Sequence, residues 1–197
     1  MFPNFRMSRG KRFTSLHASC TMLLLLTAAA CLNDETLISD EKNQKNLISN
    51  SSFEIDNKPT LQGWVADSAR DNLVKDAPPQ GGQWSIKLEA GWAPQEGFAE
   101  TYYSGDTGKN IYRLTVWIKT LHQWDGTISL GLKKSGQTII RKSASRDSPQ
   151  WSQLSLQDTL SVSRADSIII RLSAGITEVR RGEARFDLVR LERVPIK

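Results

Sequence analysis

Apolar and polar residues alternate with a period of two through most of the chain after residue 80. The clearest case is the segment IYRLTVWIK at residues 111–119, in which every second residue from Tyr112 to Ile118 is apolar. Because successive side chains of a strand point to opposite faces, we expect this apolar face to enter a core. The opposite face carries Trp117, which we therefore expect to point away from the core.

The same alternation predicts further strands, bounded by clusters of Gly, Pro, Asp and Asn. Together with the first segment they cover residues 83–90, 97–103, 111–119, 126–133, 137–143, 151–156, 167–173 and 183–193. No segment shows sustained helical periodicity. We therefore predict an all-β fold, a jelly-roll β-sandwich of two antiparallel sheets.

The first thirty residues follow a different pattern. A leader with four basic residues and no carboxylate precedes the apolar run TMLLLLTAAAC, residues 21–31. This run is too short for a permanent membrane-spanning helix, and it ends in small residues. It resembles a bacterial lipoprotein signal peptide, which implies that residues 1–30 are removed and that Cys31 becomes the lipidated first residue. Cleavage by the ordinary signal peptidase, with Cys31 left as a free thiol, is the open alternative.

Residues 31–45 are polar and contain no aromatic side chain, so we expect a flexible tether there. Asp34 and Glu35 in this segment resemble the acidic export tags of some bacterial lipoproteins. With Cys31 they predict a protein of the bacterial cell envelope, anchored to a membrane by its lipid in the outer membrane or at the cell surface. The remaining residues, 46–197, are sufficient for a single domain with its own core.

Charge and cysteine content exclude several classes of protein. Lys and Arg number 26 against 21 Asp and Glu, and four of the basic residues lie in the leader, so the rest of the chain is nearly neutral. Without a basic surface to neutralise phosphates, we expect no nucleic-acid partner. Cys20 lies in the leader, so Cys31 is the single cysteine after it, which excludes an intrachain disulfide and a cysteine zinc site.

Motifs for catalysis are missing from the sequence as well. His122 is the single histidine after the leader, no serine lies in a Gly-x-Ser-x-Gly motif, and no glycine-rich phosphate loop is present. A carboxylate pair of the kind that glycosidases use stays open on composition alone. The strands, however, leave little loop length for a catalytic cleft, so we predict a protein that is not an enzyme.

Six sequence blocks carry a resemblance to a known family over nearly the whole domain. They are NLISNSSFE (46–54), GW (63–64), GGQWSIKLEA (81–90), IYRLTVWIKT (111–120), QWSQLSL (150–156) and RFDLVRLE (185–192). In this order they resemble the CenC-like group of carbohydrate-binding modules, within the galactose-binding-like superfamily. The resemblance implies a jelly roll that binds a carbohydrate, either a polysaccharide or another glycan, without catalysis.

The resemblance also implies a structural calcium ion between the first and last strands. The matching positions are Glu54 and Asp187, and calcium prefers such oxygen ligands. The chain departs from the family where Leu188 follows Asp187, since the family often has two adjacent acids there. The alternative is that Glu54 is an edge acid and Asp187 a turn or capping acid.

Tryptophans are the first candidates for sugar contact, because their rings lie flat against pyranose faces. Trp64 and Trp151 match core positions of the family, so we expect both in the core. Trp84 shares its strand parity with apolar residues, so we expect it in the core or at its edge. Trp117 and Arg113 share the outward parity of their strand and form the leading candidate pair. A loop that covers Trp117 is the alternative.

Four further residues complete the candidate carbohydrate site. Trp92 and Trp124 lie in predicted loops, where aromatic side chains often mark binding. Tyr102 and Tyr103 end a predicted strand, so one of them must point outward. These six aromatic and basic residues are expected to line a cleft. The second functional hypothesis is a surface interaction or assembly lipoprotein that uses the same sandwich to hold a protein partner.

Overall fold

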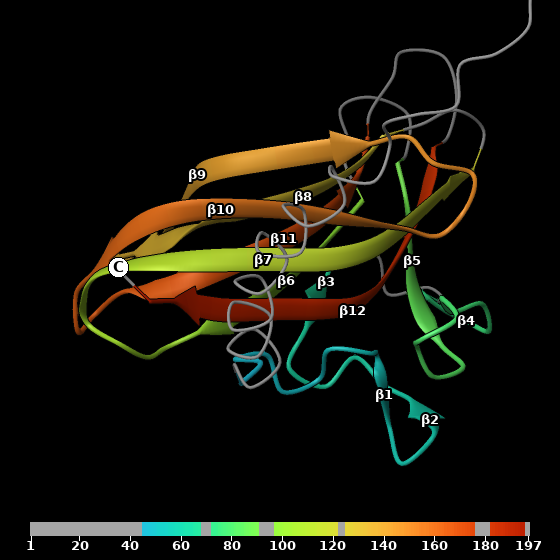
Figure 1. Cartoon of the computed structure of the whole chain (residues 1–197), viewed down its shortest axis with the longest axis horizontal. Helices are drawn as coiled ribbons and strands as arrows, with labels where there is room; N and C mark the ends of the chain where they lie inside the picture. Colours follow the sequence, from blue (N-terminus) through green and yellow to red (C-terminus); the bar gives the residue numbers. More distant parts are fainter. Residues whose placement is uncertain (1–44, 68–71, 91–96, 122–124, 176–181, 196–197) are drawn as a thin grey trace, which may run out of the picture. The chain divides into compact units, whose positions relative to one another are not determined.

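The computed structural model describes residues 45–67, 72–90, 97–121, 125–175 and 182–195. These residues form strands and connecting loops without any helix, and they belong to the unit that spans Gln44–Lys197 (Figure 1). In this part of the chain no helix is long and apolar enough to cross a membrane. The all-β prediction is confirmed for the described residues.

Two five-stranded antiparallel sheets make up the sandwich. The first, here called the β7 sheet, has the order β10 (Ser152–Val162), β7 (Gly108–Leu121), β12 (Glu183–Val194), β5 (Ser85–Glu89) and β4 (Leu73–Val74). The second, the β11 sheet, has the order β3 (Val65–Ala66), β6 (Phe98–Tyr103), β11 (Ser167–Ala174), β8 (Gly126–Lys134) and β9 (Gln137–Arg146). A separate hairpin joins β1 (Glu54–Ile55) to β2 (Lys58–Pro59). This is the predicted jelly-roll architecture.

All eight predicted strands are present, with β7, β9 and β10 longer than expected. β10 continues to Val162 because its alternation of exposed and buried residues continues that far. The four strands that the sequence did not predict, β1 to β4, have two residues each. Two residues are too few for a period of two to be recognised.

β7 lies between β10 and β12 and shows the predicted division into two faces. Tyr112, Leu114, Val116 and Ile118 are fully buried. Trp117 and the other residues of its parity are only partly buried and lie on the outer face of the sheet. The alternation read from the sequence therefore assigned the two faces of this strand correctly.

The core lies between the two sheets and extends to the segment before β1. Trp64 is 7% exposed, and its ring centroid lies 5.0 Å from that of Phe53. Its indole Nε1 donates a hydrogen bond to the carbonyl oxygen of Asn50 over 2.7 Å. Trp64 is therefore a core residue, as predicted. Trp84 is partly buried immediately before β5, on the parity of the fully buried Ile86 and Leu88.

The first described segment runs beside the last strand. Asn46 is the main contact, since its Nδ2 donates to the carbonyl of Val189 over 3.0 Å and its Oδ1 accepts from the amide of Leu191 over 3.0 Å. The amide of Leu47 also donates to the carbonyl of Leu191 over 2.9 Å. We call this set of contacts the Asn46 clamp. It joins the beginning of the domain to β12.

Two β-bulges interrupt the regular pairing. In β12 the register shifts between Asp187 and Arg190, and Leu188 there has a positive φ of 49°. In β9 the register shifts at Arg141, because Leu130 pairs with Lys142 while its neighbour on β8 pairs with Ile140. Such bulges change the direction of nearby side chains. The bulge in β12 lies beside Asp187, and the bulge in β9 lies at Arg141.

Candidate functional site

Trp117 lies near the middle of the outer face of the β7 sheet. Its register partners are Gln153 on β10 and Asp187 on β12. Arg113 lies four residues away on the same face of β7, beside Gln157 of β10. The indole of Trp117 is partly exposed and forms no hydrogen bond or ring contact with another described residue. We call this surface the Trp117 face.

Trp151 belongs to the same face, so its assignment to the core was wrong. Ser152 pairs with Ile118, which places Trp151, immediately before it, beside Lys119 on the outer side. Trp151 is partly exposed. Because Trp117 pairs with Gln153, the two tryptophans are diagonal neighbours on adjacent strands. The Trp117 face thus carries two partly exposed indoles.

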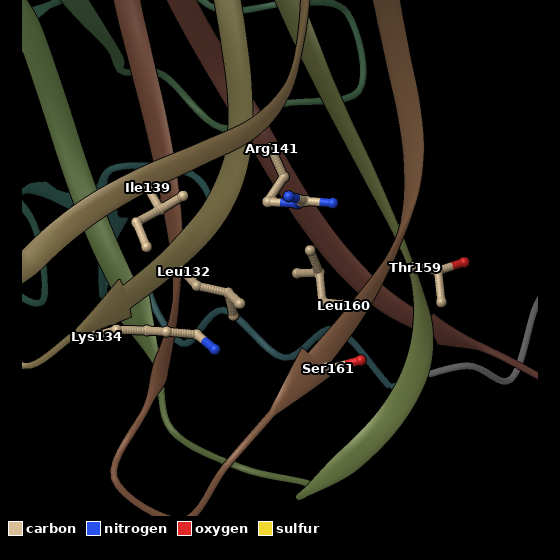
Figure 2. Close-up of a pocket in the computed structure, with 7 residues that line it drawn as sticks. All are labelled: Leu132, Lys134, Ile139, Arg141, Thr159, Leu160 and Ser161. Carbon is tan, nitrogen blue, oxygen red and sulfur yellow. The ribbon is translucent and has the colours of Figure 1, made fainter.

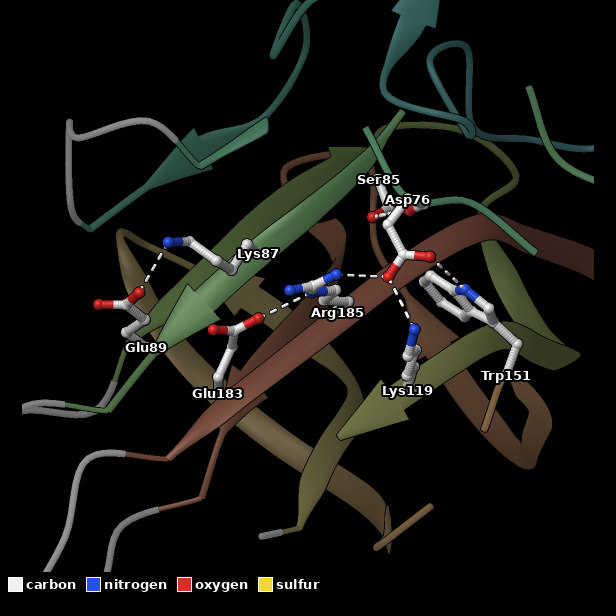
Figure 3. A network of polar contacts seen from close by, with 8 residues as sticks. All are labelled: Asp76, Ser85, Lys87, Glu89, Lys119, Trp151, Glu183 and Arg185. Carbon is white, nitrogen blue, oxygen red and sulfur yellow. Dashed lines mark hydrogen bonds and ion pairs between the residues drawn. The ribbon is translucent and has the colours of Figure 1, made fainter. Parts of the chain in front are cut away.

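Asp76 holds Trp151 and two basic side chains at this face (Figure 3). Its Oδ1 accepts a hydrogen bond from Trp151 Nε1 over 3.2 Å, and its Oδ2 accepts one from Lys119 Nζ over 3.0 Å. Arg185 NH1 donates to the same Oδ2. Burial alone would raise the pKa of Asp76, but these three donors outweigh it and the pKa is lowered from 3.8. Asp76 is therefore a fixed anion that orients the Trp151 indole.

Arg185 joins the Asp76 group to a second carboxylate. Its Nε donates to Glu183 Oε1 over 2.7 Å, on the same strand. Burial would lower the pKa of Arg185, but the hydrogen bonds to Glu183 and Asp76 raise it. On the neighbouring β5, Lys87 forms an ion pair with Glu89 over 2.7 Å (Figure 3). The charged side chains at this end of the face are thus paired internally.

Asp187 and Glu54, the two residues matched to a calcium site, lie close to each other. Asp187 is fully buried, and its Oδ1 accepts a hydrogen bond from the amide of Leu188 over 2.7 Å. Its Oδ2 has no hydrogen-bond partner among the described residues. Burial raises the pKa of Asp187 to about 7, and the negative charge of Glu54 adds to this rise, while the Leu188 amide opposes it. A buried carboxylate oxygen is therefore left without a counter-charge.

The loop between β4 and β5 closes over both carboxylates. A Cβ on Gly81 would lie 2.4 Å from Asp187 Oδ2, and a Cβ on Gly82 would lie 1.3 Å from Glu54 Oε1. Glu54 Oε2 accepts a hydrogen bond from the amide of Gln83 over 2.9 Å. A side chain at either glycine would therefore displace the carboxylate beside it. No group of three or more His, Cys, Asp or Glu residues that could hold a metal exists in the described part of the chain.

The structure does not bring the two tyrosines to the Trp117 face. Tyr102 lies on the outer side of the β11 sheet, where its hydroxyl donates to Glu100 Oε2 over 2.6 Å. Burial and this hydrogen bond raise its pKa to about 12. Tyr103 packs against the core, and a Cβ on Gly105 would lie 2.3 Å from its ring. Trp92 and Trp124 lie outside the described residues.

A second polar group surrounds Tyr102 on the outer side of the β11 sheet. Arg171 pairs in register with Glu100 and donates to its Oε1 over 2.6 Å. The Arg171 guanidinium also lies 4.8 Å from the ring centroid of Phe98. The ammonium of Lys133 lies 4.4 Å above the Tyr102 ring. We call this surface the Tyr102 face.

Sequence reasoning missed Trp151 as a surface residue and Asp76 altogether. The parity of its own strand gave the correct signal for Trp151, because Leu154 and Leu156 are buried and Trp151 has the opposite parity. Asp76 had no comparable signal. It is a single acid in a loop, and its partners come from distant segments of the chain.

Comparison with known proteins establishes the fold. No family model and no curated protein matches the chain. The CBM22-1 xylan-binding domain of Xyn10C from Paenibacillus barcinonensis has a TM-score of 0.56 and 16% identity, over 78% of this chain and 97% of that one. A family 16 carbohydrate-binding module has a TM-score of 0.54 and 17% identity, over 74% and 99%.

A further similar structure is the enzymatically active domain of tailspike protein 4 from bacteriophage CBA120. Its TM-score is 0.56 at 14% identity, over 76% of this chain. The chain spans 21% of the length of that protein. The described domain is therefore a jelly-roll β-sandwich of the architecture found in carbohydrate-binding modules.

Proposed function

We propose that this chain is a non-catalytic glycan-binding module whose ligand lies on the Trp117 face. The observation that carries the proposal is the pair of partly exposed indoles, Trp117 and Trp151, on adjacent strands of this fold. Its architecture is shared with a xylan-binding domain and a family 16 carbohydrate-binding module. These likenesses support glycan binding in general and leave the sugar open.

The Trp117 face offers the groups that a sugar ring needs. The apolar C–H face of a pyranose stacks on an indole ring, and amide and hydroxyl side chains exchange hydrogen bonds with its hydroxyl groups. Gln153, Ser155 and Gln157 are exposed along β10 beside β7, and Arg113 is partly exposed. An extended glycan running along these strands would meet aromatic and polar groups in turn.

The Tyr102 face is less suitable for stacking. The Lys133 ammonium already lies over the Tyr102 ring, and the phenol hydroxyl is bonded to Glu100. Trp117 has no such ring contact with the described residues. The two faces therefore provide a direct test, since a ring can be removed from either one.

The test is retention on a panel of immobilised polysaccharides, with the purified full chain and the variants Trp117→Ala and Tyr102→Ala. We expect one glycan class to retain the wild type, W117A to weaken that retention at least tenfold with an unchanged thermal midpoint, and Y102A to retain binding. If Y102A loses glycan retention and W117A keeps it, the glycan site lies on the Tyr102 face instead. No binding to any glycan by the folded protein would favour a protein partner.

A protein partner is the second candidate function, and strand β9 supports it. This edge strand is exposed along nearly its whole length, with Ile139 40% and Ile140 37% exposed. An exposed edge strand with apolar side chains is a surface to which a partner's strand adds. Replacing Ile140 by Lys should then abolish capture of the partner without changing glycan retention.

We further propose that the module is a lipoprotein of the cell envelope, attached through Cys31 in the outer membrane or at the cell surface. The apolar run before Cys31 and the polar segment after it support this proposal. Labelling of growing cells with a fatty-acid analogue should mark the wild-type protein and should not mark Cys31→Ala. A labelled C31A protein would exclude this site.

We also propose that Glu54 and Asp187 hold a structural calcium ion. The unpartnered Oδ2 of the buried Asp187 and the nearby Glu54 support the proposal, because hard carboxylate oxygens suit calcium. Bound calcium would supply the positive charge that these two groups lack. Calcium should raise the thermal midpoint of the wild type and leave Asp187→Asn unchanged; an equal effect on both would refute the assignment.

A further inference from the structure

The sandwich is open along the edge where strand β9 of one sheet meets strand β10 of the other. Lys142 Nζ donates to the carbonyl of Gln157 over 2.9 Å, and Arg146 NH1 donates to the carbonyl of Gln153 over 2.9 Å. These contacts bridge part of the seam between the two strands. Nearer the start of β9 no such bridge joins the described residues, and a cleft opens there.

This cleft has a volume of about 310 Å³ and an apolar floor (Figure 2). The floor consists of Leu132, Ile139 and Leu160, from β8, β9 and β10. None of these side chains is aromatic. The volume lies at the lower end of the range for small-ligand pockets, about 300–1,000 Å³. The cleft is therefore suited to a small ligand or to one residue of a polymer.

Arg141 is the main charged group of the cleft, and the β9 bulge explains its position. The register shift leaves Arg141 as the extra residue between Ile140 and Lys142. Figure 2 shows its side chain extending from β9 toward β10. Within the described ranges Arg141 has no hydrogen-bond or ion-pair partner. Its guanidinium is thus available to a ligand.

Three further polar groups line the cleft. Lys134 is half-exposed and lies 3.5 Å from Asp166, which also accepts a hydrogen bond from the amide of Ser163. Thr159 and Ser161 line the cleft along β10, but their parity is opposite to that of Leu160, so their hydroxyls point to the outer face of the β7 sheet (Figure 2). The cleft therefore combines two cationic side chains with an aliphatic floor.

We infer that this cleft binds the carboxylated sugar residue of an acidic glycan, a hexuronate; the inference rests on the proposal that the module binds glycans. A planar carboxylate accepts two parallel hydrogen bonds from a guanidinium, as Arg141 can provide. The aliphatic floor matches a C–H face of the sugar ring.

The test is calorimetric titration of the purified full chain with an oligogalacturonate and with a neutral galacto-oligosaccharide of equal length, at physiological ionic strength. The variants are Arg141→Gln, Arg141→Lys and the matched control Arg146→Gln, which removes the same charge from the same strand. We expect R141Q to weaken uronate binding at least tenfold. R141K should have an intermediate effect, since it keeps the charge without the paired donors, and R146Q should stay within twofold of the wild type.

The outcomes separate this inference from the proposed function. Three results would each refute the uronate site: equal losses of uronate affinity in R141Q and R146Q, equal affinity for the neutral and the uronate oligosaccharide, or no uronate binding at all. If W117A abolishes binding of a neutral glycan while no uronate binds, the glycan site on the Trp117 face is supported and the uronate site in the cleft is refuted. If R141Q removes uronate binding, W117A leaves that binding intact and no neutral glycan binds, the uronate site is supported and the site on the Trp117 face is refuted.

Discussion

Replacing Asp76 by Ala should both destabilise the domain and weaken glycan binding. The carboxylate accepts hydrogen bonds from Lys119, Trp151 and Arg185, so its loss leaves three donors without their acceptor. Trp151 would then be free to rotate away from its present orientation. We expect lower affinity on the Trp117 face even though Asp76 is not itself one of the side chains assigned to sugar contact.

The expected size of the destabilisation follows from the exposure of the partners. The side chains of Asp76 and Lys119 are 25% and 23% exposed, and that of Arg185 is 20% exposed. A buried hydrogen bond to a charged group is worth about 1.5–3 kcal/mol, and an exposed ion pair about 0.2–1 kcal/mol. Taking about 1 kcal/mol for each of the three contacts gives a loss of about 3 kcal/mol in the free energy of unfolding.

Urea unfolding at neutral and acidic pH measures this loss. The control is Asp106→Ala, which removes an exposed carboxylate paired with Arg193 and should cost about 0.5 kcal/mol or less. Because the pKa of Asp76 is lowered on folding, its contribution is present above its ordinary pKa of 3.8 and is lost as the pH falls through the folded value. The difference in the free energy of unfolding between wild type and D76A should therefore become smaller below about pH 4. A D76A protein as stable as D106A at neutral pH would refute the reasoning.

Three further variants test the loops and the bulge. In the presence of a calcium chelator, D187N should be more stable than the wild type above pH 7. The pKa of Asp187, about 7 in the folded protein, makes the wild-type free energy of unfolding fall as the pH rises from about 4 to 7. A D187N protein that is less stable than the wild type in urea unfolding would contradict this. Gly82→Ala should displace the flexible end of Glu54 and abolish the calcium-dependent rise in thermal midpoint, and a retained rise would contradict the site. Gly131→Ala places a Cβ 2.2 Å from the carbonyl oxygen of Ile139 and should cost about 1–3 kcal/mol in urea unfolding; no loss would mean that the β9 bulge is adaptable.

The strands were predictable from the sequence because their signal is local. Every second residue from Tyr112 to Ile118 is apolar, and the structure buries that face completely. Trp151 shows how a resemblance can mislead: its family position suggested the core, whereas the parity of Leu154 and Leu156 indicated the surface. The local pattern was the better guide, since burial in a sheet follows parity directly.

The polar groups were harder to predict because their contacts are not local. Asp76 meets Lys119 and Arg185 only after three strands have paired in register. The β9 bulge at Arg141 depends on the pairing with β8, and the sequence IIRK gives no sign of it. The proximity of Glu54 and Asp187 followed from the resemblance, but the closing of the glycine loop over them did not.

The Asn46 clamp would have a mechanical consequence if the chain is anchored ahead of residue 45, as proposed. A force on the chain ahead of residue 45 reaches the sandwich first at Asn46, whose side chain is bonded to both Val189 and Leu191. The load therefore passes straight into β12, which pairs with β7 and thus reaches the sheet that carries Trp117. A pull between an anchor and a ligand on that sheet would be transmitted through these two strands, and the β11 sheet would lie outside the path of the load.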